Sequence, residues 1–160
     1  MVSKAVTLIV VLLAAVAGAP LSTAQSSTYT PQPRVYKVDS RQIVLRPGQG
    51  IEVKYHFDKG SAMLYSWKAT ATVPFEFHGV PDQLPPGAAK DYYESHEKDD
   101  TGKIESHGHF ISPSTGIHGW WWENKTDKEV TVTLVTAGFY NRAIEFSRAG
   151  ERQLEIQEAK

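Results

Sequence analysis

The chain has 160 residues, with 17 Lys and Arg against 18 Asp and Glu, and it has no cysteine. This length suits one domain with one hydrophobic core. The near-neutral charge argues against a phosphate-binding surface, and therefore against nucleic acid as a partner. The lack of cysteine excludes disulfides and lipoprotein attachment, so the stability of the fold must come from packing, chiefly of aromatic side chains.

The N-terminus has the order of a secretory signal peptide. Lys4 precedes an apolar run from Ala5 to Ala17, and the small residues Ser22-Thr23-Ala24 follow. This run is shorter than the about 20 apolar residues that a membrane-spanning helix needs. We expect residues 1–24 to be cleaved after Ala24, which predicts a periplasmic or secreted protein with no stable membrane span. The alternative is an uncleaved N-terminal anchor. Residues 25–34, rich in Ser, Thr, Pro and Gln, are expected to form a flexible lead-in.

Residues 35–148 show short runs in which apolar and polar residues alternate, separated by Gly, Pro and Asp turns. This pattern predicts an all-β domain, an antiparallel β-sandwich of the jelly-roll type with very little helix. A hairpin is expected between the fourth and fifth strands. The expected strands are Val35–Asp39, Gln42–Leu45, Ile51–Phe57, Ser61–Ala69, Val73–His78, Ile104–Ile111, Ile117–Glu123, Glu129–Tyr140 and an edge strand at Ala143–Ser147.

Two segments depart from this alternation. Val80–Lys103 carries several prolines and the acidic, tyrosine-containing run Lys90–His96, which predicts a long loop with a short strand inside it. Loops of this length are often functional. The charged residues 149–160 are expected to form a C-terminal tail, with a frayed helix at Glu151–Lys160.

Five segments resemble a family of small exported or membrane-anchored bacterial proteins that has no assigned reaction. They are Arg46–Tyr55, Met63–Trp67, Phe75–Gly79, Gly116–Asn124 and Val130–Leu134. This resemblance covers most of the expected domain and implies its fold and its export. A more distant similarity is to the GOLD (Golgi dynamics) domain of secretory-pathway cargo proteins, carried by Phe75–Phe77, Gly116 and Trp120–Asn124. It implies a GOLD-like β-sandwich used for binding. The chain differs from that pattern because it lacks the two cysteines and the C-terminal membrane span.

Histidines are the best candidates for a metal site. On a strand, Glu105, His107 and His109 project from the same face, and two imidazoles at this spacing can share one divalent ion. A third ligand would come from His118, His78 or Glu105, and imidazole suits both zinc and copper. The alternative is that His107 and His109 are polar residues on the outer face of a sheet.

A second candidate site combines histidines and tryptophans. His78 and His118 each lie beside a glycine and close to large aromatic residues. Alternation turns Trp121 away from Trp120 and Trp122, so at least one indole should be exposed or lie at a sheet edge. We therefore place a candidate ligand site at His78, His118, Trp120 and Trp122, suited to a sugar ring or a hydrophobic partner. The alternative is that these histidines pin strand ends by hydrogen bonds and that the indoles pack in the core.

Catalytic motifs are missing from the sequence. It contains no Gly-x-Ser-x-Gly elbow, His-Glu-x-x-His helix or Gly-rich phosphate loop. A pair of carboxylates among Glu76, Glu105 and Glu123 would permit a glycosidase. The sequence favours an exported, non-enzymatic module that binds a protein, small-molecule or carbohydrate ligand. A periplasmic metal-binding protein is the alternative, and an enzyme acting on cell-envelope carbohydrate is the third hypothesis.

Overall fold

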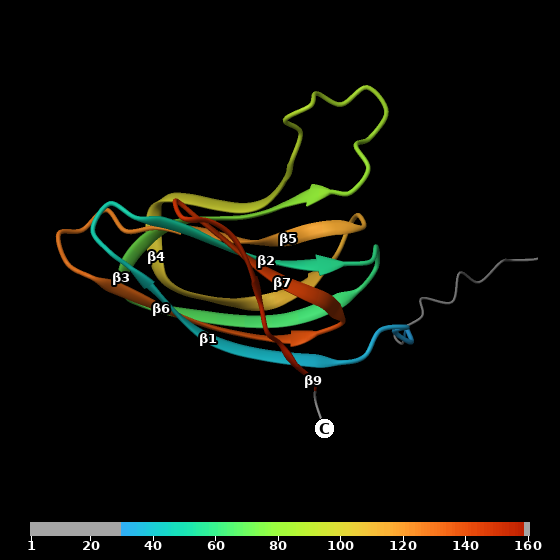
Figure 1. The fold of residues 1–160 in the computed structure, drawn as a ribbon, viewed down its shortest axis with the longest axis horizontal. Coiled ribbons are helices and arrows are strands. Elements are labelled where there is room, and N and C mark those ends of the chain that lie inside the picture. The colour runs from blue at the N-terminus through green and yellow to red at the C-terminus, as the bar shows by residue number, and fades with distance from the viewer. Residues whose placement is uncertain (1–29, 159–160) are drawn as a thin grey trace, which may run out of the picture. The chain divides into compact units, whose positions relative to one another are not determined.

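The fold consists of antiparallel strands in one curled sheet (Figure 1), as seen in a computed structural model that describes residues 30–158. The expected signal peptide, its cleavage site and residues 25–29 of the lead-in lie outside the described residues. No helix among residues 30–158 is long and apolar enough to cross a membrane. The strands are β1 Lys37–Leu45, β2 Gly50–Phe57, β3 Ala62–Pro81, β4 Glu94–Ile111, β5 Gly116–Glu123, β6 Val130–Gly138, β7 Tyr140–Ser147, β8 Gly150–Leu154 and β9 Gln157–Glu158.

One long strand, β3, connects the two halves of the curled sheet. The strand order is β8-β7-β2-β5-β3-β6-β1-β9, and β4 pairs with β3 beside this path. The first part of β3, Met63–Ala69, pairs with β6, whereas the last part, Phe75–Pro81, pairs with β5. The two ends of the sheet therefore face each other across one core, as in a sandwich or barrel-like domain. The predicted all-β class is confirmed.

Alternating side chains build the core as expected from the sequence. On β2, Val53, Tyr55 and Phe57 are fully buried, and on β5 Trp120 and Trp122 are fully buried. The rings of Trp120 and Trp122 stack with their centroids 6.0 Å apart. Burial of large aromatic side chains supplies the stability that the cysteine-free chain cannot obtain from disulfides.

The predicted hairpin between residues 61–69 and 73–78 is wrong, because β3 runs through both segments without a turn. Thr70-Ala71-Thr72 holds none of the Gly, Asn or Asp residues that tight turns need, and threonine favours extended backbone. The pairing with β4 is instead irregular around Val73. Opposite this point, Gly102 has a φ of +89°, and a Cβ atom there would lie 2.6 Å from the carbonyl carbon of Val73.

The loop predicted for Val80–Lys103 is shorter than expected. Strand β4 already begins at Glu94, and the loop is confined to residues 82–93, which stand off the sheet (Figure 1). Strand β4 pairs only with β3, and strands with one free edge commonly carry charged side chains. Because the first part of β4 is charged, it shows no alternation of apolar residues, and the sequence pattern does not predict a strand there.

The C-terminal segment also differs from its prediction. The frayed helix expected for 151–160 is wrong within the described residues, since Gly150–Leu154 pairs with β7 as β8. Leu154 is buried in the core. The sheet thus continues past residue 148. At the other end of the sheet, the two short strands expected near residues 35–45 form the single strand β1.

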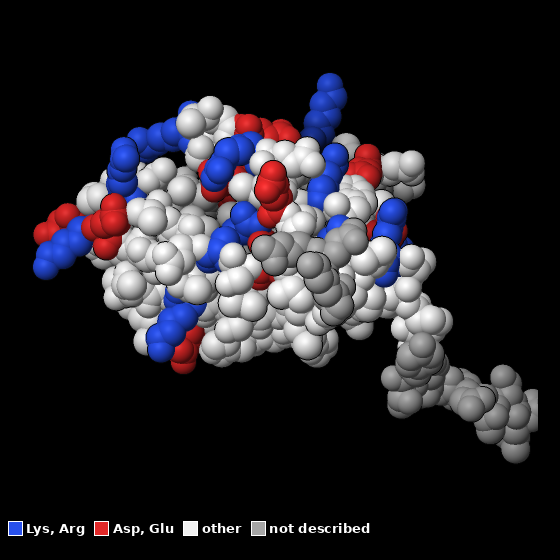
Figure 2. All heavy atoms as spheres, turned by 60° about the horizontal axis from the view of Figure 1, so that its bottom comes forward, with Lys and Arg blue, Asp and Glu red and all other residues white. Residues whose placement is uncertain are grey.

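The charged side chains on the face seen in Figure 2 are mixed in sign, with Lys and Arg lying beside Asp and Glu. Exposed ion pairs, such as that of Arg152 with Glu145, also occur on the surface of the described residues. Over the described residues, this face carries no patch of a single charge.

Candidate metal centre and ligand pocket

Strands β3 and β5 each carry a His-Gly dipeptide, and the two dipeptides pair with each other. His78 lies opposite Gly119, and Gly79 lies opposite His118. Because side chains alternate along a strand, His118 points into the core while His78 points to the outer face. A Cβ atom at Gly79 would lie 1.9 Å from Nδ1 of His118, so His118 requires a glycine at this position. The pairing places one histidine on each face of the same sheet.

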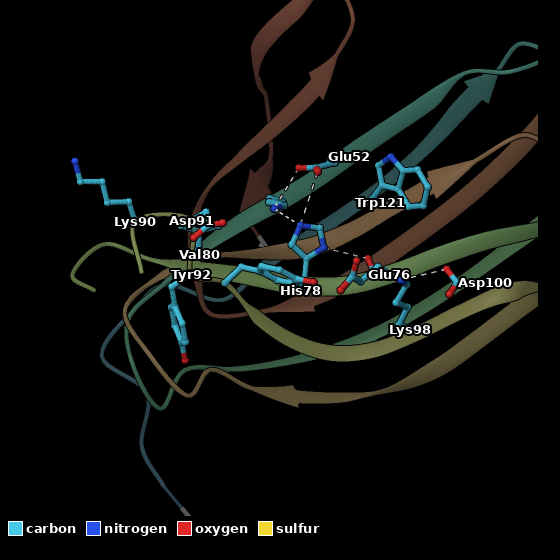
Figure 3. Close-up of a pocket in the computed structure, with 12 residues that line it drawn as sticks. Glu52, Glu76, His78, Val80, Lys90, Asp91, Tyr92, Lys98, Asp100 and Trp121 are labelled. Carbon is cyan, nitrogen blue, oxygen red and sulfur yellow. Dashed lines mark hydrogen bonds and ion pairs between the residues drawn. The ribbon is translucent and has the colours of Figure 1, made fainter. Parts of the chain in front are cut away.

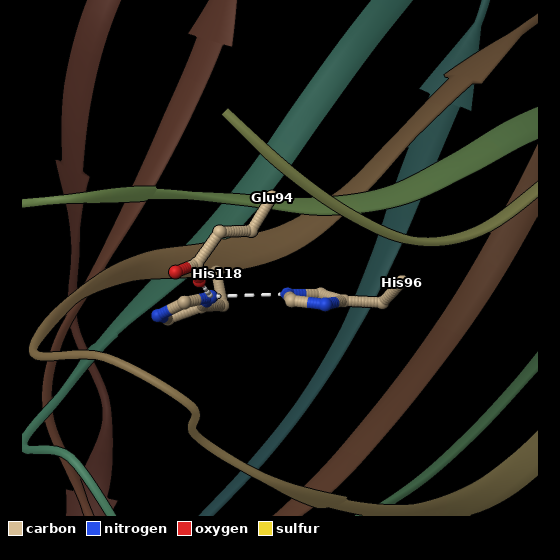
Figure 4. Close-up of side chains that lie close together, drawn as sticks. All are labelled: Glu94, His96 and His118. Atoms are coloured by element: carbon tan, nitrogen blue, oxygen red, sulfur yellow. Dashed lines mark hydrogen bonds and ion pairs between the residues drawn. The ribbon is translucent and has the colours of Figure 1, made fainter. Parts of the chain in front are cut away.

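His118 contacts two side chains from the beginning of β4. The Nε2 atom of His96 lies 3.1 Å from Nδ1 of His118, and Oε2 of Glu94 lies 3.9 Å from the same nitrogen. Figure 4 shows the three side chains converging on one point. One ligand atom from each residue lies within 4.8 Å of the others. Two imidazoles and a carboxylate are a donor set that zinc uses in proteins, and imidazole also suits copper.

Ser114 orients two of these three side chains. Its carbonyl oxygen can only accept a hydrogen bond, so Nε2 of His118, 3.2 Å away, must be the donor. The neutral ring of His118 then has its lone pair on Nδ1, the atom that faces His96 and Glu94. The Ser114 hydroxyl donates to Oε2 of Glu94 at 2.9 Å. Histidines that bind metals almost always have a partner of this kind on their second nitrogen.

Aromatic rings enclose the two imidazoles. The ring of Phe110 lies 5.3 Å from that of His118 and 4.9 Å from that of His96, and Phe77 lies 4.9 Å from His96. Burial lowers the pKa of His118 to about 4, and burial also lowers the pKa of His96. Both imidazoles are therefore neutral at pH 7, which is the form that binds metal ions.

A cavity of about 740 Å³ lies on the opposite face of the sheet, next to the loop of residues 82–93. Strand β2 contributes Glu52 and Lys54 to its lining, β3 contributes Glu76 and His78, and β5 contributes Trp121. Figure 3 shows His78 between Glu52 and Glu76, with Trp121 to one side. We call this cavity the outer pocket.

A buried lysine holds His78 in the outer pocket. The Nζ atom of Lys54 donates to Nε2 of His78 at 2.7 Å and forms an ion pair with Glu52 at 3.2 Å. Lys54 and His78 reach each other across Gly119, which lies between them in the sheet. Burial lowers the pKa of Lys54, and Glu52 partly opposes this effect. Burial and the neighbouring ammonium group of Lys54 lower the pKa of His78, which therefore acts as a neutral acceptor.

Of the predicted metal ligands, only His118 belongs to the group that it forms with Glu94 and His96, which we call the inner cluster. His107 and His109 lie exposed on β4, and the hydroxyl of Ser66 lies 2.8 Å from Nδ1 of His107. Their strand positions turn both side chains to the outer face, whereas His118 points inward. His107, His109 and His118 therefore do not converge on one ion. Within residues 30–158, the three-residue group that could hold a metal includes neither His107 nor His109.

The predicted ligand-binding residues are divided between the two faces. His78 lines the outer pocket, but His118, Trp120 and Trp122 are fully buried. Trp121 does face away from Trp120 and Trp122, as the alternation predicts. It is Trp121, and not the other two, that lines the outer pocket.

Of the three candidate carboxylates, only Glu76 lines the outer pocket. Glu105 lies 3.7 Å from Lys68 and Glu123 lies 3.4 Å from Lys125 in ion pairs. The glycosidase hypothesis stays a prediction.

The sequence analysis did not include Glu94 and His96 among the candidate ligands, although both belong to the three-residue group that could hold an ion. A signal was present, because a Glu-x-His spacing puts both side chains on one face of a strand. Glu105 and His107 have the same spacing. Glu94 and His96 lie in the segment for which the sequence predicts a long loop, where side chains do not alternate between two faces.

No protein-family model matches this chain, and no curated protein matches its sequence. The resemblance to GOLD domains and to exported bacterial proteins stays a prediction. The function of the two sites has to be argued from their geometry.

Proposed function

We propose that this protein is an exported metal-binding module that holds one zinc or copper ion between Glu94, His96 and His118. The observation that carries the proposal is the 3.1 Å distance between the facing nitrogens of His96 and His118. Two imidazole nitrogens on one tetrahedral zinc ion, at about 2.0–2.1 Å each, lie about 3.3 Å apart. The ligand atoms therefore need to move little to accept an ion.

Metal binding requires one change of tautomer. Without an ion, the hydrogen on Nε2 of His96 is donated to Nδ1 of His118. When His96 instead carries its hydrogen on Nδ1, both facing lone pairs point toward the same place. Glu94, held by Ser114, adds a negative oxygen that compensates part of the charge of the ion.

The surroundings favour holding an ion over catalysis. Three protein ligands leave one position of a tetrahedral shell for a further donor. His118 has an exposed fraction of 0%, and the rings of Phe77 and Phe110 pack against the two imidazoles. Glu94 and His96 are only partly buried, so an ion would enter from their side. We infer a role in binding or carrying the metal.

An ion at this site would also cross-link the fold. Glu94 and His96 lie on β4 and His118 lies on β5, and these strands are separated in the sheet by β3. An ion that binds the folded chain and not the unfolded chain raises the free energy of unfolding. The increase is about 2.7 kcal/mol when the free ion is at 100 times its dissociation constant.

The direct test is titration of Zn²⁺, Cu²⁺ and Ni²⁺ into chelator-treated protein, followed by calorimetry. We expect one ion per chain, with binding weakened at least tenfold by His96→Ala or Glu94→Gln, both at partly exposed positions. The matched control is the double variant His107→Ala, His109→Ala, which removes two exposed histidines from the same strand and should bind like the wild type.

Two results would contradict the proposal. One is the absence of binding tighter than micromolar for all three ions. The other is binding that survives His96→Ala but is lost in the His107→Ala, His109→Ala control. Export is tested separately by sequencing the N-terminus of the protein recovered outside the cytoplasm, where Gln25 is expected as the first residue.

A further inference from the structure

We propose that the outer pocket binds a neutral carbohydrate, with the indole of Trp121 as the surface on which a sugar ring rests. This site is independent of the metal centre, since it lies on the other face of the sheet and none of Glu94, His96 and His118 lines it. The first observation is the order of side chains across the sheet. Glu52, Trp121 and Glu76 lie in one row on adjacent strands, so a carboxylate stands on each side of the indole.

The position of the indole is set by a glycine. A Cβ atom at Gly50 would lie 2.7 Å from Nε1 of Trp121, so the ring extends over a part of β2 that has no side chain. Trp121 is half-buried, in contrast to Trp67, Trp120 and Trp122, which are fully buried. A fixed, half-buried indole that borders a cavity can offer a π face to the C–H groups of a sugar.

The charges of the lining favour a neutral ligand. Four acidic residues and three lysines line the pocket, so their charges nearly cancel. Several are already paired within the pocket, as in the contacts of Glu52 with Lys54 at 3.2 Å and of Asp100 with Lys98 at 3.3 Å. A strongly anionic or cationic ligand would meet as much repulsion as attraction here.

The same groups suit hydroxyls. Carboxylates accept hydrogen bonds from them and lysines donate to them, and hydrogen bonds to charged groups are stronger than neutral ones. The loop adds the rings of Tyr92 and Tyr93, and the ring of Tyr93 lies 5.6 Å from that of His78 in an edge contact. A volume of about 740 Å³ lies within the range of small-molecule sites, which is about 300–1,000 Å³, and accommodates a short saccharide.

The test is an NMR titration of the ¹⁵N-labelled protein with a panel of neutral sugars: glucose, galactose, mannose, N-acetylglucosamine, maltose, cellobiose and chitobiose. We expect saturable shifts for at least one of them, and among the four indole N–H signals the shift should be largest for Trp121. Trp121→Ala should raise the dissociation constant about tenfold or more. Tyr36→Ala is the matched control, because Tyr36 is an exposed aromatic residue that does not line the outer pocket.

Three outcomes would overturn the proposal. The first is that no neutral sugar produces a saturable shift. The second is that Trp121→Ala and Tyr36→Ala have equal effects on binding. The third is that glucuronate or galacturonate binds more tightly than the corresponding neutral sugars, which would point to an anion site. The titration is run on both chelator-treated and zinc-loaded protein, so failure of the metal centre leaves this result interpretable.

Discussion

His78 and His118 have the same neighbour, a glycine, but they stand on opposite faces of one sheet and have different partners. His118 is fully buried among aromatic rings, is fixed by a backbone carbonyl, and faces another imidazole and a carboxylate. His78 lies at an open pocket and accepts a hydrogen bond from a lysine ammonium. The acceptor nitrogen of His118 faces another imidazole and a carboxylate, whereas the acceptor nitrogen of His78 faces a cation. The face of the sheet, and not the residue type, decides which chemistry each histidine can support.

The largest effect that we expect is that of Gly79→Ala. The added methyl group would lie 1.9 Å from Nδ1 of His118, so either the imidazole or the strand must move. We expect a loss of about 4 kcal/mol in the free energy of unfolding, together with loss of metal binding, while the outer pocket is affected only through global stability. Urea unfolding measures the first effect.

A double-mutant cycle identifies the cause of that loss. In Gly79→Ala, His118→Ala the methyl group no longer meets an imidazole, so the double variant should be more stable than the sum of the two single losses predicts. Strictly additive losses would show that the close approach of Gly79 to His118 is not what makes the glycine necessary.

The second largest effect that we expect is on the pH dependence of the free energy of unfolding, to which His118 and His78 should contribute differently. The pKa of His118 falls from 6.5 to about 4 on folding, so the unfolded chain binds the extra proton between these values. The contribution of neutral His118 to the free energy of unfolding is therefore fully present above pH 6.5 and is lost as the pH falls toward 4. The loss from this group is about 3 kcal/mol. The groups that face His118 are His96 and Glu94.

Urea unfolding of chelator-treated protein at a series of pH values measures this slope. His118→Gln should remove most of the slope between pH 6.5 and 4, whereas His78→Gln should leave most of it in place. The reverse ranking of the two variants would mean that the outer histidine, not the buried one, couples folding to protonation.

The smallest effect that we expect is that of Ser114→Ala. The substitution keeps the carbonyl that fixes His118 but removes the hydroxyl that orients Glu94. Metal affinity should fall about tenfold, as is typical when an indirect partner of a ligand is lost. Sugar titration of the same variant should be unchanged, since Ser114 does not line the outer pocket. Unchanged metal affinity would mean that Glu94 is not a ligand.

Local alternation was enough to predict the central strands but not the long ones. On β6 every second residue is buried. On β2 and β5 the alternating apolar residues are buried as expected, although polar residues between them, such as Lys54 and His56, are buried as well. Strand β3 was divided because Thr70–Thr72 interrupts the apolar alternation, although nothing there forms a turn. The first part of β4 was missed because its charged side chains are stable on an edge strand.

The candidate sites were predicted in part for the same reason. His78 and His118 were singled out from their glycine and aromatic neighbours, and both occupy the sites described above. Glu94 and His96 were missed together with the start of β4. The spacing of His107 and His109 is correct for a shared ion, but spacing along one strand does not show whether a third ligand lies nearby. That depends on which strands are neighbours, and here β3 lies between β4 and β5.

The pairing of His78-Gly79 with His118-Gly119 also limits which mutations in β5 the protein can tolerate. A substitution such as Trp121→Ala alters one face of the sheet and spares the other. An insertion or deletion of one residue within β5 reverses the direction of every side chain beyond it, unless a bulge absorbs the change. His118 would then point toward solvent, and Trp120 and Trp122 would exchange faces with Trp121. The sites on the two faces depend on the same alternation of side chains along β5. One such change would therefore remove both.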